Sequence, residues 1–170
     1  PDKVKVISRL RGYHGLTLAA MSATGLPAFW PMFEPRVPGF VHIDAPDPYR
    51  FVNPDPTVSL GVAAANQLEA AILREGPETV AAVYLEPVQN AGGCLVPPEG
   101  YFQRVREICD RHGVLLVSDG NVPGLARRVR ASLQEAGMRV VGASVPSGEA
   151  SKSLAQVERL ARLAAEAGLR

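Results

Sequence analysis

The sequence predicts an α/β protein in which helices cover both faces of a mainly parallel sheet, giving a three-layer sandwich. Short apolar runs rich in β-forming residues alternate along the chain with segments whose apolar residues recur at helical spacing. The chain has 170 residues, of which 46% are apolar and 21% charged. Such a chain can bury a core, and its composition is typical of a globular protein.

The first elements follow one another in order. The run Val4-Lys5-Val6-Ile7-Ser8 predicts a strand over residues 3–8. A helix over residues 15–23 and a strand over residues 40–44 are predicted next. Four prolines within residues 46–56 favour an irregular extended loop. Because the chain opens directly in a strand and without Met, we expect it to be a piece of a longer protein.

The middle of the chain continues the alternation. A helix over residues 61–75 leads to a strand over residues 80–85, and a helix over residues 99–112 leads to a strand over residues 114–118. Both strands are almost wholly apolar, as expected for strands that are buried on two faces. Gly113 follows the third helical stripe, and glycine tolerates the left-handed conformation that ends a helix.

The last predicted elements are a helix over residues 123–136, a strand over residues 138–145 and a helix over residues 153–167. The two helices depend on apolar stripes at helical spacing. The stripes are formed by Leu125, Val129, Leu133 and Ala136, and by Leu154, Val157, Leu160, Ala161 and Ala164. Gly137 and Gly168 predict the ends of these helices.

Composition and spacing exclude several classes of function. A formal charge of +1 offers phosphate backbones no excess of basic charge, so we predict no nucleic-acid role. No apolar run approaches the roughly 20 residues of a membrane span, and no signal peptide opens the chain, so we expect no membrane role. Cys94 and Cys109 lack the spacing of a metal site or a disulfide framework, which predicts a reduced, cytoplasmic setting without a metal.

The first candidate site is the glycine-flanked pair Tyr13 and His14, between the first strand and the first helix. Glycine lets a backbone approach closely, so such a turn can lay a flat ring against a flat cofactor. The residues alone favour a plainer alternative, which is a turn with a half-buried tyrosine.

Glu86 and Asp119 form the second candidate site. Each follows an apolar run and stands where a strand would emerge at the carboxyl edge of the sheet, where α/β enzymes place their chemistry. A carboxylate there can hold a protonated ring nitrogen and keep a cofactor electron-withdrawing. It can equally cap the next helix or bind a loop amide, and spacing alone leaves these alternatives open.

Two segments carry a family resemblance. They read SRLRGYHGLTLAAMSATGLP from Ser8, and LEPVQNAGGCLVPPEGYFQRVREICDRHGVLLVSD from Leu85 to Asp119. Residues 1–119 resemble the large domain of class III pyridoxal-phosphate-dependent aminotransferases, the omega-transaminase group. The resemblance implies pyridoxal phosphate as cofactor and the transfer of an amino group between an amine or amino acid and a 2-oxo acid. It also implies a homodimer.

By this resemblance, Tyr13 would stack on the pyridine ring of the cofactor beside His14. Glu86 would lie near the cofactor and the substrate amine, and Asp119 would pair with the pyridinium nitrogen. An ionised aspartate keeps that nitrogen protonated, which stabilises the carbanion formed when an amino acid loses its α-proton. The expected catalytic residues are therefore Glu86 and Asp119.

The sequence also departs from the family. The chain's lysines are Lys3, Lys5 and Lys152, and none lies in a segment similar to the motif of the family's Schiff-base lysine. Without that amine, we expect transamination by this chain alone to fail or to be very weak. The glycine-serine helix start that binds the cofactor phosphate in the family is also missing. The resemblance is predicted to end at Asp119, since the family's Asp-Glu-Val becomes Asp119-Gly120-Asn121.

A second resemblance begins at Val114. The segment VLLVSDGNVPGLARRVRASLQEAGMRVVGASVPSGEASKSLAQVERL is similar to the start of a 3-dehydroquinate synthase, whose nucleotide-binding half contains Asp-x-Asn and Gly-Glu-x-x-Lys. The resemblance implies a partial Rossmann-like βαβα unit that could bind NAD. The implied NAD contacts are Asp119, Asn121, Glu149 and Lys152.

The residues themselves offer a plainer interpretation of the Gly-Glu-x-x-Lys segment. It can be a loop that enters a helix, with Ser151 or Ser153 as the N-cap and Glu149 near the positive end of the helix. Both interpretations stay open.

Together the resemblances predict two incomplete segments, an aminotransferase-like one over residues 1–118 and a dehydroquinate-synthase-like one over residues 119–170. Both families place a strand ending in Asp at this junction, so the chain could be a chimera whose sheet runs through residues 114–118. Three functions remain open. They are a pyridoxal-phosphate domain derived from an aminotransferase, an NAD-binding module and an inactive α/β scaffold.

Overall fold

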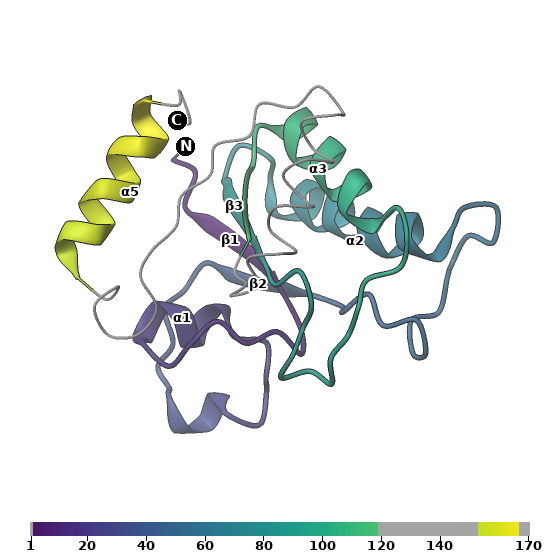
Figure 1. Cartoon of the computed structure of the whole chain (residues 1–170), viewed down its shortest axis with the longest axis horizontal. Helices are drawn as coiled ribbons and strands as arrows, with labels where there is room; N and C mark the ends of the chain where they lie inside the picture. Colours follow the sequence, from purple (N-terminus) through teal and green to yellow (C-terminus); the bar gives the residue numbers. More distant parts are fainter. Residues whose placement is uncertain (1, 119–152, 167–170) are drawn as a thin grey trace. The chain divides into compact units, whose positions relative to one another are not determined.

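The structure is a computed structural model, and it describes residues 2–118 and 153–166 (Figure 1). The chain divides into two compact units, residues 1–121 and residues 122–170. The helix predicted over residues 123–136 and the strand predicted over residues 138–145 lie outside the described residues. The predicted domain boundary after residue 118 stays a prediction.

A four-stranded parallel sheet forms the centre of the first unit. Its strands are β1 (Lys5–Arg9), β2 (Phe40–Ile43), β3 (Val80–Leu85) and β4 (Leu115–Ser118). They lie in the order β2-β1-β3-β4, and every neighbouring pair is parallel. The predicted parallel α/β fold is confirmed. The run before Asp119 belongs to the same sheet, as the junction hypothesis requires.

The hydrophobic core lies between one face of this sheet and two helices, α2 (Leu60–Glu75) and α3 (Tyr101–His112), which pack side by side (Figure 1). One row across the sheet consists of Val41, Ile7, Val83 and Leu116. The helices add the buried residues Leu68, Ile72, Val105 and Ile108. Fully burying an apolar side chain of this size contributes about 1.5–3 kcal/mol, and of these eight residues only Val41 and Leu116 are partly buried.

The opposite face of the sheet is contacted by α1 (Leu18–Ala23). Ser8 and His42 are register partners in β1 and β2. Ser8 Oγ donates to the carbonyl of Ala23 at 2.7 Å, and His42 Nε2 lies 3.2 Å from the same oxygen. Burial lowers the pKa of His42, so its ring is neutral when it bonds this carbonyl at neutral pH. Helices therefore contact both faces of the sheet, in agreement with the predicted layers.

Two helices begin more than one residue later than predicted. Gly15 adopts a φ of +122°, and α1 begins at Leu18 instead of residue 15. Helix α3 begins at Tyr101 instead of residue 99, and it ends at His112, after which Gly113, with a φ of +59°, is the predicted left-handed cap. Local backbone conformation thus shortens two helices, and the three α-helices predicted within residues 2–118 are all present.

In the second unit the structure describes α5 (Leu154–Glu166), close to the predicted range. The backbone N–H of Gln156 donates to Ser153 Oγ at 3.3 Å, so Ser153 caps this helix, one of the two predicted caps. None of the described helices combines the length and the apolar character that crossing a bilayer requires.

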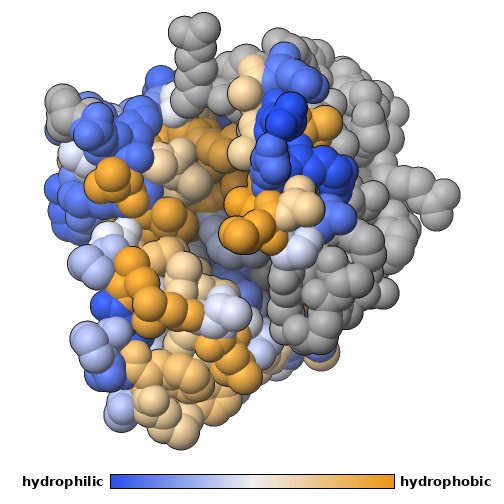
Figure 2. Space-filling model, turned by 90° about the vertical axis from the view of Figure 1, so that its left-hand side faces the viewer, coloured by the Kyte–Doolittle hydropathy of each residue, from blue (hydrophilic) through white to orange (hydrophobic). Residues whose placement is uncertain are grey.

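The sequence analysis missed the short 3₁₀-helix η1 (Trp30–Met32). Trp30 Nε1 donates to the carbonyl of Thr24 at 2.9 Å, and the guanidinium of Arg36 lies 4.1 Å from the indole ring. Hydrophobic side chains gather in the lower part of Figure 2, where Figure 1 places α1 and η1. Exposed hydrophobic residues in these two segments or directly before them are Leu16, Leu18, Phe29 and Met32. An apolar patch of this kind is typical of a surface that another segment or chain covers.

The two cysteines are free thiols in different surroundings. Cys94 is exposed, whereas Cys109 is buried in α3, and burial raises the pKa of its thiol to about 12. Among the residues that the structure describes, no group of three or more His, Cys, Asp or Glu side chains could hold a metal ion.

Candidate active site at the carboxyl edge of the sheet

The candidate site lies where loops leave the carboxyl ends of β1 and β3. Tyr13 and His14 belong to the loop after β1, and Glu86 is the first residue after β3. Because β1 and β3 are hydrogen-bonded neighbours, the fold brings together residues that are 73 positions apart in the sequence. Asp119 directly follows β4 in the sequence and lies outside the described residues, as do the predicted NAD contacts.

Glu86 is held through both oxygens of its carboxylate. Oε1 accepts a hydrogen bond from the backbone N–H of Tyr13 at 2.8 Å, and Oε2 accepts one from the backbone N–H of Asn90 at 3.4 Å. The residue is only 8% exposed. The carboxylate therefore binds loop amides, which was one of the alternatives left open. Its role toward a cofactor stays a prediction.

Tyr13 and His14 present their rings differently. Tyr13 is 37% exposed, whereas the ring of His14 stacks on the ring of Tyr84 at 4.3 Å between centroids and 20° between planes. The backbone N–H of His14 donates to Thr24 Oγ1 at 2.9 Å. Tyr13 is thus the more exposed member of the pair, and its backbone N–H binds Glu86, while His14 packs against β3.

Close backbone contacts shape the turn that carries Tyr13. Gly12 N donates to the carbonyl of Arg9 at 3.1 Å, and Gly25 N donates to the carbonyl of Gly12 at 2.9 Å. Gly25 also accepts a hydrogen bond from the backbone N–H of Arg11. A Cβ on Gly25 would lie 2.1 Å from the Arg9 carbonyl oxygen, so the segment after α1 approaches the end of β1 as only glycine allows.

Arg11 connects three loops at this edge. Its guanidinium forms an ion pair with Asp47, which follows β2, and its Nη2 donates to the carbonyl of Gly92 after β3 at 2.7 Å. The hydrogen bond from Arg11, followed by one from the backbone N–H of Tyr49, holds the pKa of Asp47 below its ordinary value. Sequence analysis predicted the proline-rich loop around Asp47 but missed this pair.

We expect this ion pair to make stability depend on pH on the acid side. Because the pKa of Asp47 is lower in the folded protein than in the unfolded chain, the contribution is fully present above about pH 4 and is lost as pH falls through the folded value. Urea midpoints at pH 7 and at pH 3 measure it. Asp47→Asn should lower the midpoint at pH 7 and reduce the difference between the two pH values. An unchanged difference would show that the pair contributes nothing.

The lysines of the first unit lie away from this edge. Lys3 Nζ donates to the carbonyls of His112 and Gly113 at 3.1 and 2.8 Å. Lys5 Nζ forms an ion pair with Glu75 at 3.0 Å. Lys5 begins β1 and Lys3 precedes it, whereas Tyr13 follows the other end of that strand. Neither side chain is placed to reach Glu86, and Lys152 lies outside the described residues.

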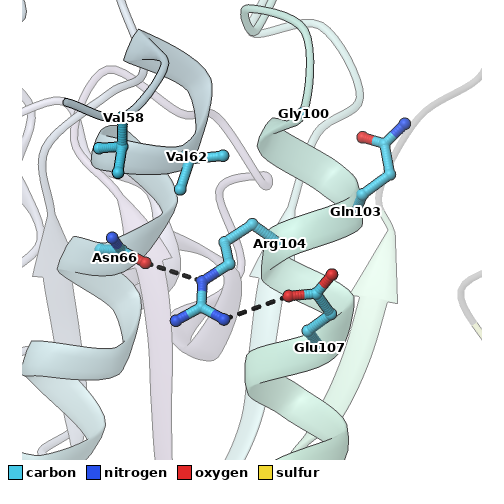
Figure 3. A pocket seen from close by; sticks show the side chains of 7 residues that line it. All are labelled: Val58, Val62, Asn66, Gly100, Gln103, Arg104 and Glu107. Atoms are coloured by element: carbon cyan, nitrogen blue, oxygen red, sulfur yellow. Dashed lines mark hydrogen bonds and ion pairs between the residues drawn. The ribbon is translucent and has the colours of Figure 1, made fainter.

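A pocket of about 460 Å³ lies between α2 and α3 (Figure 3), and it is a weaker candidate for a functional site than the carboxyl edge of the sheet. Its lining residues are Val58, Val62, Asn66, Gly100, Gln103, Arg104 and Glu107. The guanidinium of Arg104 donates to Asn66 at 2.8 Å, to Glu107 at 3.1 Å and to Glu69 at 2.8 Å. Because all three contacts satisfy it within the protein, Arg104 joins the two helices and leaves little charge for a ligand.

Comparison with known proteins identifies relatives of the same part of the chain. The family described as aminotransferase class-III matches residues 1–128, beyond the end predicted at Asp119. The probable aminotransferase Rv3329 of Mycobacterium tuberculosis is 55% identical over 119 residues, which are 70% of this chain and 26% of that protein. The chloroplastic gamma aminobutyrate transaminase 3 of Solanum lycopersicum is 42% identical over 128 residues, 75% of this chain and 25% of that protein.

Solved structures agree with these relatives. The omega transaminase from Pseudomonas jessenii in complex with PMP has a TM-score of 0.64 and 42% sequence identity. The likeness covers 69% of this chain and 26% of that one. The chain thus spans about a quarter of the length of the relatives that it matches.

Proposed function

Because the chain belongs to the class III aminotransferases, we propose that it supplies part of a pyridoxal-phosphate site. The reaction of such a site is the transfer of an amino group between an amine or amino acid and a 2-oxo acid. The observation that carries the proposal is the pairing of Tyr13 with Glu86 at the ends of neighbouring strands, within the segment that matches the family.

The residues at this edge fit a flat aromatic cofactor. Tyr13 is 37% exposed, so its ring is available for a pyridine ring to stack on, and its backbone N–H binds Glu86, whose carboxylate is anchored by two amides. Bound there, pyridoxal phosphate supplies an electron sink. We assign Tyr13 to holding the ring and Glu86 to orienting the substrate amine. By family resemblance, Asp119 is assigned to the ring nitrogen.

The amine that binds the cofactor covalently is proposed to come from outside the described residues. Lys3 and Lys5 are engaged near the amino end of β1, at carbonyls of the α3–β4 turn and at Glu75. This arrangement supports the expectation that residues 2–118 alone do not transaminate. By family resemblance, a homodimer is proposed as the state in which the site is complete. NAD binding stays a prediction for residues 119–152, and no described residue favours it.

Binding of pyridoxamine 5′-phosphate tests the proposed function, because this form of the cofactor carries no aldehyde that could label lysines at random. Equilibrium dialysis should detect binding to the unmodified chain. We expect Tyr13→Ala and Glu86→Gln each to weaken it about tenfold, since a stacked ring or a charge-assisted hydrogen bond contributes about 1–2 kcal/mol.

Two matched variants serve as controls for this experiment. Tyr49 is 91% exposed and Glu78 is also exposed, so Tyr49→Ala and Glu78→Gln should leave binding unchanged. A folded chain that binds no pyridoxamine phosphate would contradict the proposal. Equal binding by all four variants would place the cofactor away from Tyr13 and Glu86.

A further inference from the structure

Arg9 is the largest fully buried side chain among the described residues, with 1% of its surface exposed. It ends β1, directly before the turn that carries Tyr13. Burial lowers the pKa of its guanidinium, against the opposing effects of Tyr101 and then of the charge of Glu86, which favour the protonated form. Burying an arginine is costly, and within residues 2–118 and 153–166 this one forms no ion pair at close range.

The contacts of Arg9 join three elements at the candidate site. Its Nη2 donates a hydrogen bond to the backbone carbonyl of Glu86, in the loop after β3. Its guanidinium carbon lies 5.6 Å from the centre of the Tyr101 ring, and Tyr101 is the buried first residue of α3. The side chain thus links the end of β1 to the loop that leaves β3 and to the helix that follows this loop.

Glu86 is consequently held at two points by one short segment of chain. Arg9 binds its backbone carbonyl, and the backbone N–H of Tyr13 binds its carboxylate. Since Tyr13 follows Arg9 by four positions, the two contacts close a ring that runs from Arg9 through Glu86 to Tyr13 and back along the chain. A closed ring of this kind fixes the position of the tyrosine relative to the carboxylate.

We propose that Arg9 is the positioning residue of this site, because its guanidinium sets the backbone of Glu86 against Tyr13. The effect of Arg9 on cofactor binding rests on the proposed function. The positioning of Glu86 against Tyr13 by Arg9 does not depend on the proposed function. Arg9 touches neither cofactor nor substrate in this proposal and acts only through Glu86.

Unsatisfied polar atoms around Arg9 support a role beyond packing. Arg9 Nη1 and the Tyr101 hydroxyl are both buried, and although the two side chains interact electrostatically, neither atom has a well-formed hydrogen bond. An apolar side chain of similar length would fill this space without the cost of desolvating a charge. Filling this space with an arginine therefore costs more free energy than filling it with an apolar side chain. An apolar side chain, however, cannot form the hydrogen bond to the Glu86 carbonyl.

Hydrogen exchange of single amides, measured by NMR, tests the proposal on the whole chain. In Arg9→Met the Glu86 backbone is no longer held in place, so the hydrogen bond from the Tyr13 amide to the Glu86 carboxylate is weakened. We expect this amide to exchange at least about tenfold faster. Arg9→Lys keeps one donor and the charge, so it should restore protection to within about threefold. The Val6 amide, which bonds the carbonyl of Gly39 within the sheet, should change by less than about threefold in both variants.

Arg74 provides the matched control, since its side chain is 61% exposed on α2 and Arg74→Met should alter neither amide. Equal acceleration of the Tyr13 and Val6 amides in Arg9→Met would mean that Arg9 only stabilises the fold, and would overturn the proposal. An unchanged Tyr13 amide would overturn it as well.

Pyridoxamine phosphate binding by the same variants separates this inference from the proposed function. We expect Arg9→Met to weaken binding about as much as Glu86→Gln does, and Arg9→Lys to recover most of it. If the unmodified chain binds no pyridoxamine phosphate while the Tyr13 amide still responds selectively to Arg9→Met, the proposed function fails and the positioning of Glu86 by Arg9 stands.

Discussion

Replacing Gly25 by alanine is expected to destabilise the fold by about 3 kcal/mol or more, among the largest effects of any single methyl group in this chain. The added Cβ would lie 2.1 Å from the carbonyl oxygen of Arg9 and 2.7 Å from Cα of Leu10. Both are backbone atoms, so no side chain can rotate away. Hydrogen bonds of Gly25 with Arg11 and Gly12 hold the two segments at this distance.

Urea unfolding measures this effect, and Gly39→Ala is the matched control. Gly39 has a φ of +90°, but a Cβ there would come no closer than 3.7 Å to the Val4 carbonyl. That variant therefore carries backbone strain without a clash, about 1–2 kcal/mol. A loss of unfolding free energy in Gly25→Ala no larger than in Gly39→Ala would contradict the close approach of Gly25 to the backbone of Arg9 and Leu10. The turn that carries Tyr13 would then have a different backbone conformation.

Gly61→Ala is expected to have the second-largest effect on stability. It should destabilise the fold, although helix propensity alone would predict that alanine stabilises it. Gly61 is the second residue of α2, where alanine is intrinsically better than glycine by about 1 kcal/mol. A Cβ there would lie 2.1 Å from the carbonyl oxygen of Glu99, in the segment that enters α3. Because backbone must shift to make room, we expect a net loss of about 2 kcal/mol.

Thermal unfolding measures this loss, and Arg74→Ala is the control on the same helix. The side chain of Arg74 is exposed, and its replacement should change stability by less than about 0.5 kcal/mol. A rise in the melting temperature of Gly61→Ala would mean that α2 does not pack against the segment before α3 as the structure has it. A fall in Gly61→Ala alone would confirm that this contact sets the spacing of the two helices.

The strands and long helices of the first unit could be predicted because their signals are local. The apolar run of β3 and the stripes of α2 and α3 predicted these elements to within two residues at each end. The start of α1 was predicted three residues too early. Apolar spacing does not register the positive φ of Gly15, which depends on how the turn before the helix packs.

The candidate site was predicted only in part. Tyr13 and Glu86 were identified by motif and by their places after strands, and the fold brings them into contact. The supporting side chains were missed, because Arg9 and Arg11 look like ordinary charged residues near the end of a strand. Their partners, Glu86 and Asp47, lie 77 and 36 positions away, and no local pattern encodes such a pairing.

By itself the sequence determined which segments of residues 2–118 form strands and α-helices, that the sheet is parallel, and which family the first part of the chain resembles. These properties follow from hydrophobic periodicity and from motifs within a few residues. Only the tertiary structure decided that Arg9 is buried, that it binds the carbonyl of Glu86, and that the Glu86 carboxylate binds the amide of Tyr13. The order of the strands puts β1 beside β3, and contacts between segments so distant in the chain exist only once that sheet has formed.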